Sequence, residues 1–322
     1  MIRIGIVGYE NIGKGSEKAV NSASDLELCA VFTRRDPKTI KLENSSVPVL
    51  TLEDADKMIG KIDVMILCGG SSTDLPVQGP QFAAKFNIVD SYDTHALIPE
   101  YISAIDAVAV KTTAVISSGW DPGLFSVMRL MSEALLPDGA SYTFWGPGVS
   151  QGHSDAIRRI EGVKNAIQYT VPIENAVSLV RSGTRPDLTT RQKHLRQCYV
   201  VALPGADKGK IENDIKTMPN YFSDYDTTVN FLEEGEFLAK HSKMPHGGTV
   251  LRSGKTGSSE HIIELGLKLD SNPEFTGSVM AAYARAAFRL SREGSFGVKT
   301  PFDIPPAYLS EKDRLTLVKE LL

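Results

Sequence analysis

The first 23 residues of this 322-residue chain predict a buried strand, a turn that begins and ends with glycine, and a helix. The strand covers Ile2–Val7, the turn covers residues 8–13 and the helix covers residues 14–23. This order is typical of a dinucleotide-binding βαβ unit, in which the N-terminus of the helix faces the pyrophosphate. We therefore expect a parallel sheet covered by helices.

The end of the second predicted strand indicates which dinucleotide is bound. Thr33, Arg34 and Arg35 follow this strand (residues 28–32), where an NAD enzyme has an acidic residue for the ribose hydroxyls. Two guanidinium groups and a hydroxyl suit a 2′-phosphate, which a carboxylate would repel. The pattern predicts NADP(H) and not NAD(H). The alternative is a tight turn in another α/β domain, with both arginines as ordinary surface charges.

Glu10 occupies the place of the middle glycine in the usual G-x-G-x-x-G turn. That glycine lets the backbone approach the pyrophosphate, whereas a Cβ crowds the approach and a carboxylate adds like charge. We expect Glu10→Gly to leave the fold intact and to tighten NADP binding. Weaker binding by this variant would mean that Glu10 faces solvent or stabilises the loop through a hydrogen bond.

Strands and helices continue to alternate up to about residue 120. Strands are predicted at residues 61–68, 88–90 and 113–118, separated by a proline-containing helix and by a helix from Pro99 to about residue 110. This alternation predicts a Rossmann-type doubly wound parallel sheet, which binds ligands at the carboxyl ends of its strands. Besides residues 33–35, the expected cofactor site consists of Gly8, Tyr9, Glu10, Asn11, Ile12, Gly13, Cys68, Gly69, Gly70, Ser71, Ser72, Thr73, Ser91, Tyr92 and Asp93.

The pattern changes after residue 120. Further strands, with more apolar–polar alternation and few helices between them, are predicted at residues 141–145, 163–173, 195–203, 227–232, 249–253 and 261–269. This is typical of a mostly antiparallel α+β domain whose last strand turns one face to water. We expect a dinucleotide-binding domain at residues 1–120 and a substrate-binding and dimerisation domain at 121–273. Helices at 275–292 and 310–322, within the segment 274–322, are expected to pack back on the first domain.

The composition, with 42% hydrophobic and 23% charged residues, is that of a globular protein. A formal net charge of −4 argues against nucleic acid or an anionic membrane as partner, and no apolar run approaches the roughly 20 residues of a membrane span. The chain starts in a strand without a secretion signal, and its three cysteines (Cys29, Cys68 and Cys198) are widely spaced. We therefore expect a cytoplasmic protein with reduced core thiols and no metal site.

Both tryptophans stand in turns of glycine and proline, Trp120 in residues 119–123 and Trp145 in residues 144–148. A rigid indole with one hydrogen-bond donor suits the wall of a pocket, although a core position is an equally good interpretation. With other segments, these turns resemble the meso-diaminopimelate dehydrogenase family over nearly the whole chain. The matching segments are residues 7–13, 32–35, 89–95, 119–123, 144–148, 150–155, 244–248 and 269–273. Glu10 departs from the family, which has glycine there.

The resemblance implies reversible oxidative deamination of meso-2,6-diaminopimelate at its D-centre, with NADP+ as hydride acceptor. The products would be L-2-amino-6-oxopimelate, ammonia and NADPH. Asp93 and Asp121 match the acids of the family near the reacting amine, so they are the candidate catalytic residues. Without the family, each would be interpreted as a turn or helix-cap carboxylate.

The substrate is symmetric apart from chirality, so its distal L-end must be held for the D-end to react. Arg196 matches the arginine of the family that binds the distal carboxylate, a role that suits the guanidinium fork. From its position alone, Arg196 would be a solvated charge and His246 a loop histidine. The remaining substrate-binding residues implied by the resemblance are Trp120, Trp145, Gln151, Gly152, Asp155, Thr170, His246 and Asn272.

Two other functions are compatible with these patterns. One is an NADP oxidoreductase of another amino or oxo-diacid, and the other is a non-catalytic NADP(H)-sensing module. The retained Asp93, Asp121 and Arg196 argue against a sensor, which does not need a two-ended diacid pocket. The family resemblance also implies a homodimer and a role in lysine or cell-wall precursor synthesis.

Overall fold

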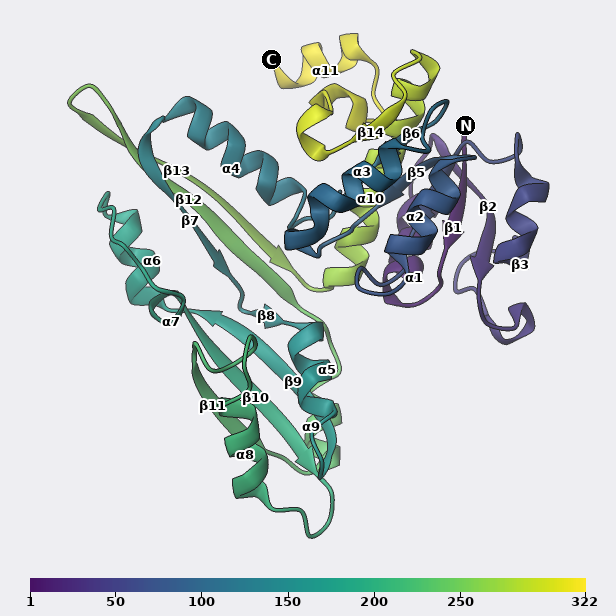
Figure 1. Cartoon of the computed structure of the whole chain (residues 1–322). Helices are drawn as coiled ribbons and strands as arrows, with labels where there is room; N and C mark the ends of the chain where they lie inside the picture. Colours follow the sequence, from purple (N-terminus) through teal and green to yellow (C-terminus); the bar gives the residue numbers. More distant parts are fainter. The chain divides into compact units, whose positions relative to one another are not determined.

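The computed structural model describes residues 1–322 and divides into two compact units. Unit 1 consists of Met1–Val127 and Pro273–Leu322, and unit 2 consists of Met128–Asn272. Figure 1 labels the strands and helices of both units. The chain passes from unit 1 to unit 2 between Val127 and Met128, within helix α4 (Leu124–Leu135).

Unit 1 is built on a seven-stranded sheet in which all neighbouring strands are parallel. The strand order is β14-β6-β5-β4-β1-β2-β3, so the chain starts in the middle and winds toward both edges. The strands are β1 (Ile2–Val7), β2 (Leu26–Thr33), β3 (Val49–Thr51), β4 (Val64–Leu67), β5 (Asn87–Asp90), β6 (Thr113–Val115) and β14 (Gly297–Lys299). The predicted Rossmann-type doubly wound sheet is confirmed.

Helices cover both faces of this sheet, and each face has its own apolar core beneath the helices. One core joins alternate residues of β1 and β4, such as Ile4 and Ile66, to α1 and α10. The other joins the opposite faces of the same strands, including Met65, to α2 and α3. The helices of this part are α1 (Asn11–Asn21), α2 (Leu75–Ala83), α3 (Ile98–Asp106), α10 (Asn272–Arg292) and α11 (Arg314–Leu321).

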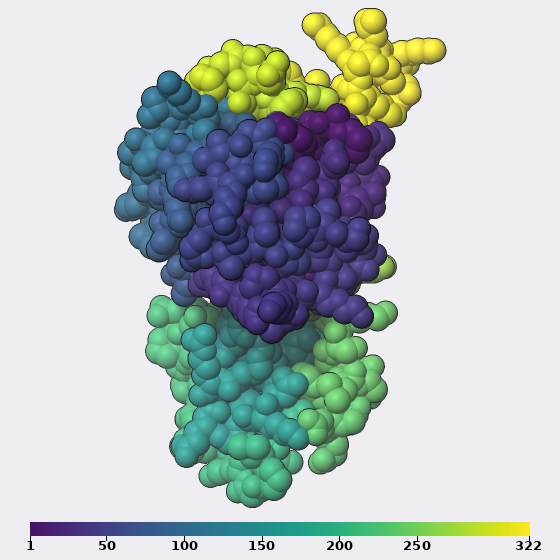
Figure 2. All heavy atoms as spheres, turned by 90° about the vertical axis from the view of Figure 1, so that its right-hand side faces the viewer, coloured from purple at the N-terminus to yellow at the C-terminus, as the bar shows by residue number.

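The C-terminal segment returns to unit 1 through α10. Gly15 of α1 and Gly277 of α10 are so close that a Cβ added at Gly277 would lie 2.4 Å from the Gly15 carbonyl carbon. Beyond α10, strand β14 pairs with β6 at the sheet edge. Helix α11 has no buried residue, and Figure 2 shows the C-terminal residues standing out from the surface of unit 1. No helix of the chain is both long and apolar enough to cross a membrane.

Unit 2 contains a four-stranded sheet, β11-β10-β9-β8, and a three-stranded sheet, β13-β12-β7. All neighbours are antiparallel except β10 and β11, as expected for a mostly antiparallel α+β domain. The strands are β7 (Asp138–Trp145), β8 (Gly148–Val149), β9 (Val163–Pro172), β10 (His194–Ala202), β11 (Asp226–Phe231), β12 (His246–Thr256) and β13 (Ser259–Leu269). The first four residues of β13 are exposed, and from Ile263 onward exposed side chains alternate with more buried ones, as expected for a strand with one wet face.

The expectation of few helices in the second half is wrong. Five short helices of four to nine residues lie in unit 2: α5 (Gln151–Arg158), α6 (Glu174–Arg181), α7 (Thr190–Lys193), α8 (Lys208–Lys216) and α9 (Glu234–His241). They are short, and side-chain caps mark the start of two of them, α7 and α8. Asp207, for example, accepts a hydrogen bond from the amide of Lys210 at the start of α8.

Some predicted boundaries also differ from the structure. Strand β4 begins at Val64 and not at residue 61, because the amides of Lys61 and Ile62 donate to the Met58 carbonyl in a turn. Strand β6 ends at Val115 and not at residue 118, because Ser117 has a φ of 54°, in the left-handed region. Both changes shorten a strand without altering the sheet order.

Candidate active site

The glycine turn at the N-terminus of α1 is tight enough to exclude side chains at both ends. Gly8 has a φ of 90°, and a Cβ at Gly13 would lie 2.2 Å from the Gly8 carbonyl oxygen. The first helical hydrogen bond runs from the Lys14 amide to the Glu10 carbonyl, at 2.9 Å. The amides at the start of α1, before Lys14, therefore have no acceptor within the helix and remain available to a ligand. This cradle fits the pyrophosphate of a dinucleotide.

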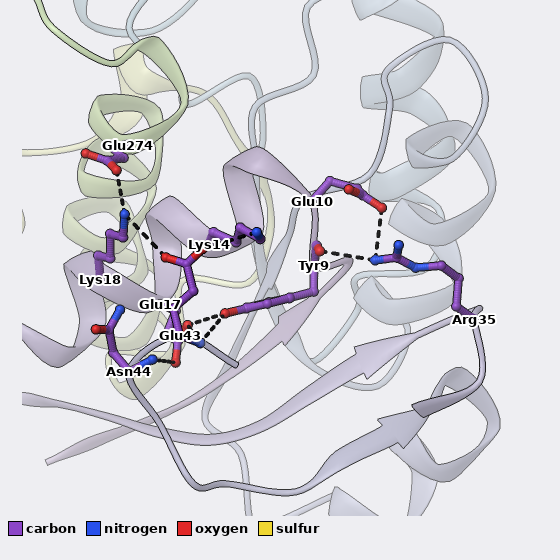
Figure 3. Close-up of polar contacts among 9 residues, drawn as sticks. All are labelled: Tyr9, Glu10, Lys14, Glu17, Lys18, Arg35, Glu43, Asn44 and Glu274. Carbon is purple, nitrogen blue, oxygen red and sulfur yellow. Dashed lines mark hydrogen bonds and ion pairs between the residues drawn. The ribbon is translucent and has the colours of Figure 1, made fainter. Parts of the chain in front are cut away.

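Glu10 and Arg35 form an ion pair beside this turn (Figure 3), with Glu10 Oε1 2.9 Å from Arg35 Nη2. The same guanidinium nitrogen donates to the Tyr9 carbonyl at 3.2 Å. Glu10 has an ordinary φ of −103°, and its side chain is 75% exposed. The turn therefore accepts a side chain here, and the carboxylate lies against the arginine assigned to the 2′-phosphate.

Arg34 also has an acidic partner in unit 1. Its Nη1 and Nη2 lie 2.7 and 3.1 Å from the two carboxylate oxygens of Asp74. Asp74 Oδ2 accepts a hydrogen bond from the Gly70 amide, so the small-residue loop after β4 is joined to the end of β2. Thr33 Oγ1 accepts from the Arg35 amide at 3.1 Å. The structure thus brings the three predicted 2′-phosphate residues to one corner of unit 1.

The side chain of Tyr9 supports the turn from inside. It is buried, and its hydroxyl donates to Glu17 (Figure 3). Glu17 is also buried. Its carboxylate accepts hydrogen bonds from the amides of Glu43 and Asn44, so it joins α1 to the segment before β3. Burial raises the pKa of Tyr9 far above its ordinary value. Only the backbone of Tyr9 is left to serve the cofactor.

Two more predicted cofactor residues have buried side chains. Cys68 Sγ lies 3.6 Å from Ser16 Oγ, and burial raises the pKa of this thiol to about 12. The Tyr92 ring stacks on Tyr101 at a centroid distance of 4.1 Å. Both positions can reach a cofactor through the backbone of their loops.

The candidate catalytic acids lie in loops after β5 and β6. The amide of Asp93 donates to Ser71 Oγ at 3.1 Å, which joins the loops after β4 and β5. Asp121 lies in a loop closed by glycines, since a Cβ at Gly123 would lie 1.7 Å from the Gly119 carbonyl oxygen. Next to it, the buried Trp120 packs edge-on against Phe125.

In unit 2, Arg196 and Thr170 are paired across strands β10 and β9. Arg196 Nη1 donates to Thr170 Oγ1, and the guanidinium lies 3.8 Å from the centre of the Tyr225 ring. Arg196 is only 6% exposed, has no carboxylate partner, and its Nε has no hydrogen-bond acceptor. Burial lowers the pKa of Arg196. A buried cation without an anion is costly, so this position is suited to a ligand that brings a carboxylate.

Trp145 is held at the end of β7 by a histidine. The Trp145 amide donates to His194 Nε2 at 2.9 Å, and the two rings stack with centroids 5.4 Å apart. Burial lowers the pKa of His194 to about 4, with a further contribution from the charge of Arg196. His194 is therefore a neutral acceptor that orients the tryptophan.

Glycines bring the remaining distal residues near Thr170. A Cβ at Gly146 would lie 2.0 Å from the Thr170 carbonyl oxygen, and a Cβ at Gly148 would lie 2.5 Å from His246 Cα. The Asn272 amide donates to the Met244 carbonyl at 3.0 Å, which holds the end of the β13 segment beside the start of β12. His246 and Asn272 are thus positioned by backbone packing.

Helix α5 adds three predicted residues to this part of unit 2. Gln151 Nε2 lies 3.0 Å from the sulfur of Met244, and Gly152 has open space where a Cβ would point. Asp155 differs from the others, because it forms an ion pair with Arg158 on the same helix. The structure therefore links Gln151 to Met244, next to the residues predicted to hold the distal end of the substrate. Asp155 is instead paired with Arg158 of its own helix.

Sequence reasoning missed His194, Tyr225 and Asp90. His194 lies two residues before Arg196 in an alternating strand, so the period of two was a usable signal for it. Tyr225 lies just before β11 and is brought to Arg196 only by strand pairing. Asp90 stands at the end of a buried strand, which is the usual place for functional acids in such sheets.

Comparisons with known proteins agree on one family. Residues 119–271 match the family described as the diaminopimelic acid dehydrogenase C-terminal domain. A meso-diaminopimelate D-dehydrogenase of Lysinibacillus sphaericus is 60% identical, with 100% of this chain and 99% of the relative covered. One of Acetivibrio thermocellus is 58% identical, with coverages of 100% and 98%. This chain belongs to the meso-diaminopimelate D-dehydrogenase family.

Solved structures of the family share the fold over the full chain. A diaminopimelate dehydrogenase mutant of Clostridium tetani, crystallised with DAP, has a TM-score of 0.94 and 52% identity, with full coverage of both chains. The C. glutamicum DAP dehydrogenase in complex with DAP has a TM-score of 0.92 and 44% identity. An engineered D-amino acid dehydrogenase bound to NADP+ has a TM-score of 0.87 and 43% identity. For the last two, coverage is 100% of this chain and 99% of the other. These matches confirm the resemblance to the meso-diaminopimelate dehydrogenase family. They also confirm the two-domain fold that we expected from the sequence.

Proposed function

We propose that this chain catalyses the reversible NADP-dependent oxidative deamination of meso-2,6-diaminopimelate at its D-centre. Water is consumed, and the products are L-2-amino-6-oxopimelate, ammonia and NADPH. The observation that carries the proposal is the buried Arg196, which has a hydroxyl partner in Thr170 but no carboxylate. In a chain that belongs to a diaminopimelate dehydrogenase family, this cation fits the carboxylate at the non-reacting end of the substrate.

The residues of unit 2 hold the distal L-end. Arg196 forms charge-assisted hydrogen bonds to its carboxylate, and Thr170 fixes the guanidinium through the bond to Nη1. His246 and Asn272 supply polar groups to the distal amine and carboxylate, while Trp145, oriented by His194, and Gln151 form the wall. Gly152 leaves open space at this wall.

The acids of unit 1 serve the reacting D-end. Asp93 and Asp121 hold the ammonium group and take up the proton that leaves as the amine becomes an imine. Trp120 packs on Phe125 and fixes the backbone just before Asp121. Holding the amine in one orientation presents a single C–H bond for hydride transfer, which is the basis of selectivity for the D-centre.

The residues of unit 1 fit NADP. The cradle of Gly8 and Gly13 accommodates the pyrophosphate, and Thr33, Arg34 and Arg35 provide a hydroxyl and two cations for the 2′-phosphate. The loops at residues 68–73 and 91–93 contribute backbone and hydroxyl groups. When bound, the nicotinamide supplies the hydride acceptor.

The broader setting of the enzyme is part of the same proposal. Residues 121–273 act as the substrate-binding and dimerisation domain of a homodimer, and the reversible reaction serves lysine or cell-wall precursor synthesis in the cytoplasm. The three cysteines form no disulfide, which fits a reducing compartment. Size measurement of the purified protein in solution tests the dimer.

The direct test measures NADPH absorbance with meso-diaminopimelate and NADP+. Parallel reactions contain NAD+, the L,L-isomer or a simple D-amino acid. We expect rapid NADPH formation with the meso isomer and NADP+ only. Turnover of another amino diacid but not of the meso isomer would reassign the substrate, and no turnover by a protein that binds NADPH would favour a sensor.

A further inference from the structure

Asp90 is a buried acid that the proposed chemistry does not use. It is the last residue of β5, which lies between β4 and β6 in the sheet, and its side chain has no exposed surface. Burial raises its pKa to about 6, although three hydrogen bonds favour the charged form. A carboxylate in such a place needs partners that compensate for its lost hydration.

The two oxygens of Asp90 have different partners. Oδ1 accepts hydrogen bonds from the amides of Tyr92 and Ser117, each at 3.0 Å. Oδ2 accepts from the Tyr101 hydroxyl at 2.7 Å. One oxygen therefore joins the loop after β5 to the loop after β6, and the other attaches the group to α3.

The backbone of Asp90 strengthens the same connection. Its carbonyl accepts the Ser118 amide at 2.9 Å and the Ser118 hydroxyl at 2.8 Å. The Ser117 amide points to Oδ1 from a residue with a φ of 54°, a conformation that non-glycine residues seldom adopt. Neighbouring groups must hold Ser117 in that conformation, and one of them is Asp90, whose Oδ1 accepts the hydrogen bond from the Ser117 amide.

Both anchored loops carry a candidate catalytic acid. Asp93 directly follows Tyr92, and Asp121 lies four residues beyond Ser117. A single carboxylate oxygen is thus bonded to the amide directly before Asp93 and to the amide four residues before Asp121. Since catalytic groups must be held to well under 1 Å, such a shared anchor affects the reaction without touching the substrate.

We propose that Asp90 is a positioning residue that sets the relative placement of Asp93 and Asp121 by binding the amides of Tyr92 and Ser117. This assignment rests on the proposed function, in which the two acids act on the reacting amine. The required property is an oxygen acceptor at the place of Oδ1, and the negative charge itself is not required.

Replacement by asparagine separates the acceptor from the charge. In Asp90→Asn the amide oxygen can keep both backbone hydrogen bonds, and the new NH2 group can donate to the Tyr101 oxygen. Asp90→Ala removes the acceptor, and Asp90→Ser leaves a smaller cavity but draws the acceptor back, because the serine Oγ takes the place of the carboxylate carbon and cannot keep both backbone hydrogen bonds. Tyr101→Phe is the matched control, because it removes only the partner of Oδ2.

The experiment measures kcat, KM for meso-diaminopimelate and Kd for NADPH in all four variants. We expect kcat to fall about 100-fold in Asp90→Ala or Asp90→Ser, with NADPH binding changed less than about 3-fold, since misplacement by about 1 Å can cost this much in rate. Asp90→Asn and Tyr101→Phe are expected to stay within about 5-fold of the original kcat. An unchanged kcat in a folded Asp90→Ser would overturn the proposal, as would equal losses in the asparagine and serine variants.

Hydrogen exchange followed by mass spectrometry gives a readout that does not need turnover. In Asp90→Ser we expect faster exchange in peptides covering residues 91–95 and 116–121, and original rates in both peptides for Asp90→Asn. Uniformly faster exchange over unit 1 would mean general destabilisation and would overturn the specific role. If the original protein does not oxidise meso-diaminopimelate, the proposed function fails, and the exchange data still decide whether Asp90 anchors the two loops.

Discussion

Glu10 lies 2.9 Å from Arg35 and neutralises the cation that is assigned to the 2′-phosphate of NADP. The pair joins the glycine turn to the end of β2, because Arg35 also donates to the Tyr9 carbonyl. A 2′-phosphate that binds Arg35 must replace this carboxylate or accept it as a like-charged neighbour. We therefore expect Glu10 to compete with the phosphate, so that this unusual turn residue lowers the affinity for the cofactor.

Glu10→Gln should tighten NADPH binding by about 1.4- to 5-fold, since an exposed ion pair contributes about 0.2–1 kcal/mol. NADH has no 2′-phosphate, so its affinity should change less. Glu10→Gly should act in the same direction and leave the fold intact. Fluorescence titrations at two salt concentrations test this, with the exposed Glu53→Gln as a control for net charge. Weaker NADPH binding in Glu10→Gln would mean that the ion pair organises the site.

Replacement of both Arg34 and Arg35 by alanine should weaken NADP(H) by more than NAD(H). The two guanidiniums are the cations of this corner, and only the 2′-phosphate requires them. The variant also releases Asp74, which still accepts the Gly70 amide, so the loop after β4 should stay closed. Binding titrations with NADPH and NADH give the ratio of losses, and equal losses for both cofactors would contradict the 2′-phosphate assignment.

The parallel sheet of unit 1 was predictable because its inner strands are continuous apolar runs separated by helices. The edge strands β3 and β14 were not, since each has three half-buried residues and no recognisable period. Strand β14 lies near the C-terminus but pairs with β6, and no local pattern reveals such a distant partner. Propensity indicates strands, whereas edge pairing depends on tertiary packing.

The distal set in unit 2 was predictable only through family motifs. Arg196 and Thr170 are 26 residues apart, and the antiparallel register of β9 and β10 brings them together. The role of His194 depends on the end of β7, which the same fold places against it. Hydrogen-bond partners of this kind are a property of strand register, which a single sequence determines weakly.

Arg196→Met should raise KM for meso-diaminopimelate about 100-fold, because loss of a buried charge pair typically costs about 3 kcal/mol. NADPH binding should be unchanged. The free protein should become more thermally stable, since the guanidinium is buried without a carboxylate partner. Steady-state kinetics, NADPH titration and thermal unfolding measure these three quantities.

Arg252→Met is the matched control for this experiment. Arg252 is also a buried arginine of unit 2, but its side chain donates to the Leu136 and Pro137 carbonyls and to Ser141. Its loss should lower stability and leave KM nearly unchanged. If Arg196→Met loses stability and NADPH affinity together, its effect comes from misfolding and not from substrate binding.

His194 should make the protein acid-sensitive between about pH 6.5 and pH 4. Its folded-state pKa of about 4 lies below the ordinary value of 6.5, so the unfolded chain takes up a proton that the folded chain excludes. The stability from this group is present above pH 6.5 and is lost as the pH falls through this window. Arg196 and Lys193 are the cations that lower the pKa, after burial itself.

Urea unfolding at pH 7.5 and pH 5.0 tests this effect, with His194→Gln as the comparison. From pH 7.5 to 5.0 the original protein should lose about 2 kcal/mol more unfolding free energy than the variant. Since His153 remains in both proteins, its titration cancels in the difference to first order. Equal losses in the two proteins would show that His194 is protonated in the folded state.

Gly277→Ala should destabilise the protein by about 1–3 kcal/mol, the usual range for overpacking. The added Cβ would lie 2.4 Å from backbone atoms of Gly15 and Ser16, so α1 and α10 would have to move apart. Gly235→Ala in α9 is the matched control, because its Cβ meets no atom within 4 Å. That variant should gain up to about 1 kcal/mol from helix propensity. The midpoints of urea unfolding for the two variants test this prediction. An unchanged midpoint in Gly277→Ala would mean that the two helices separate at little cost in free energy.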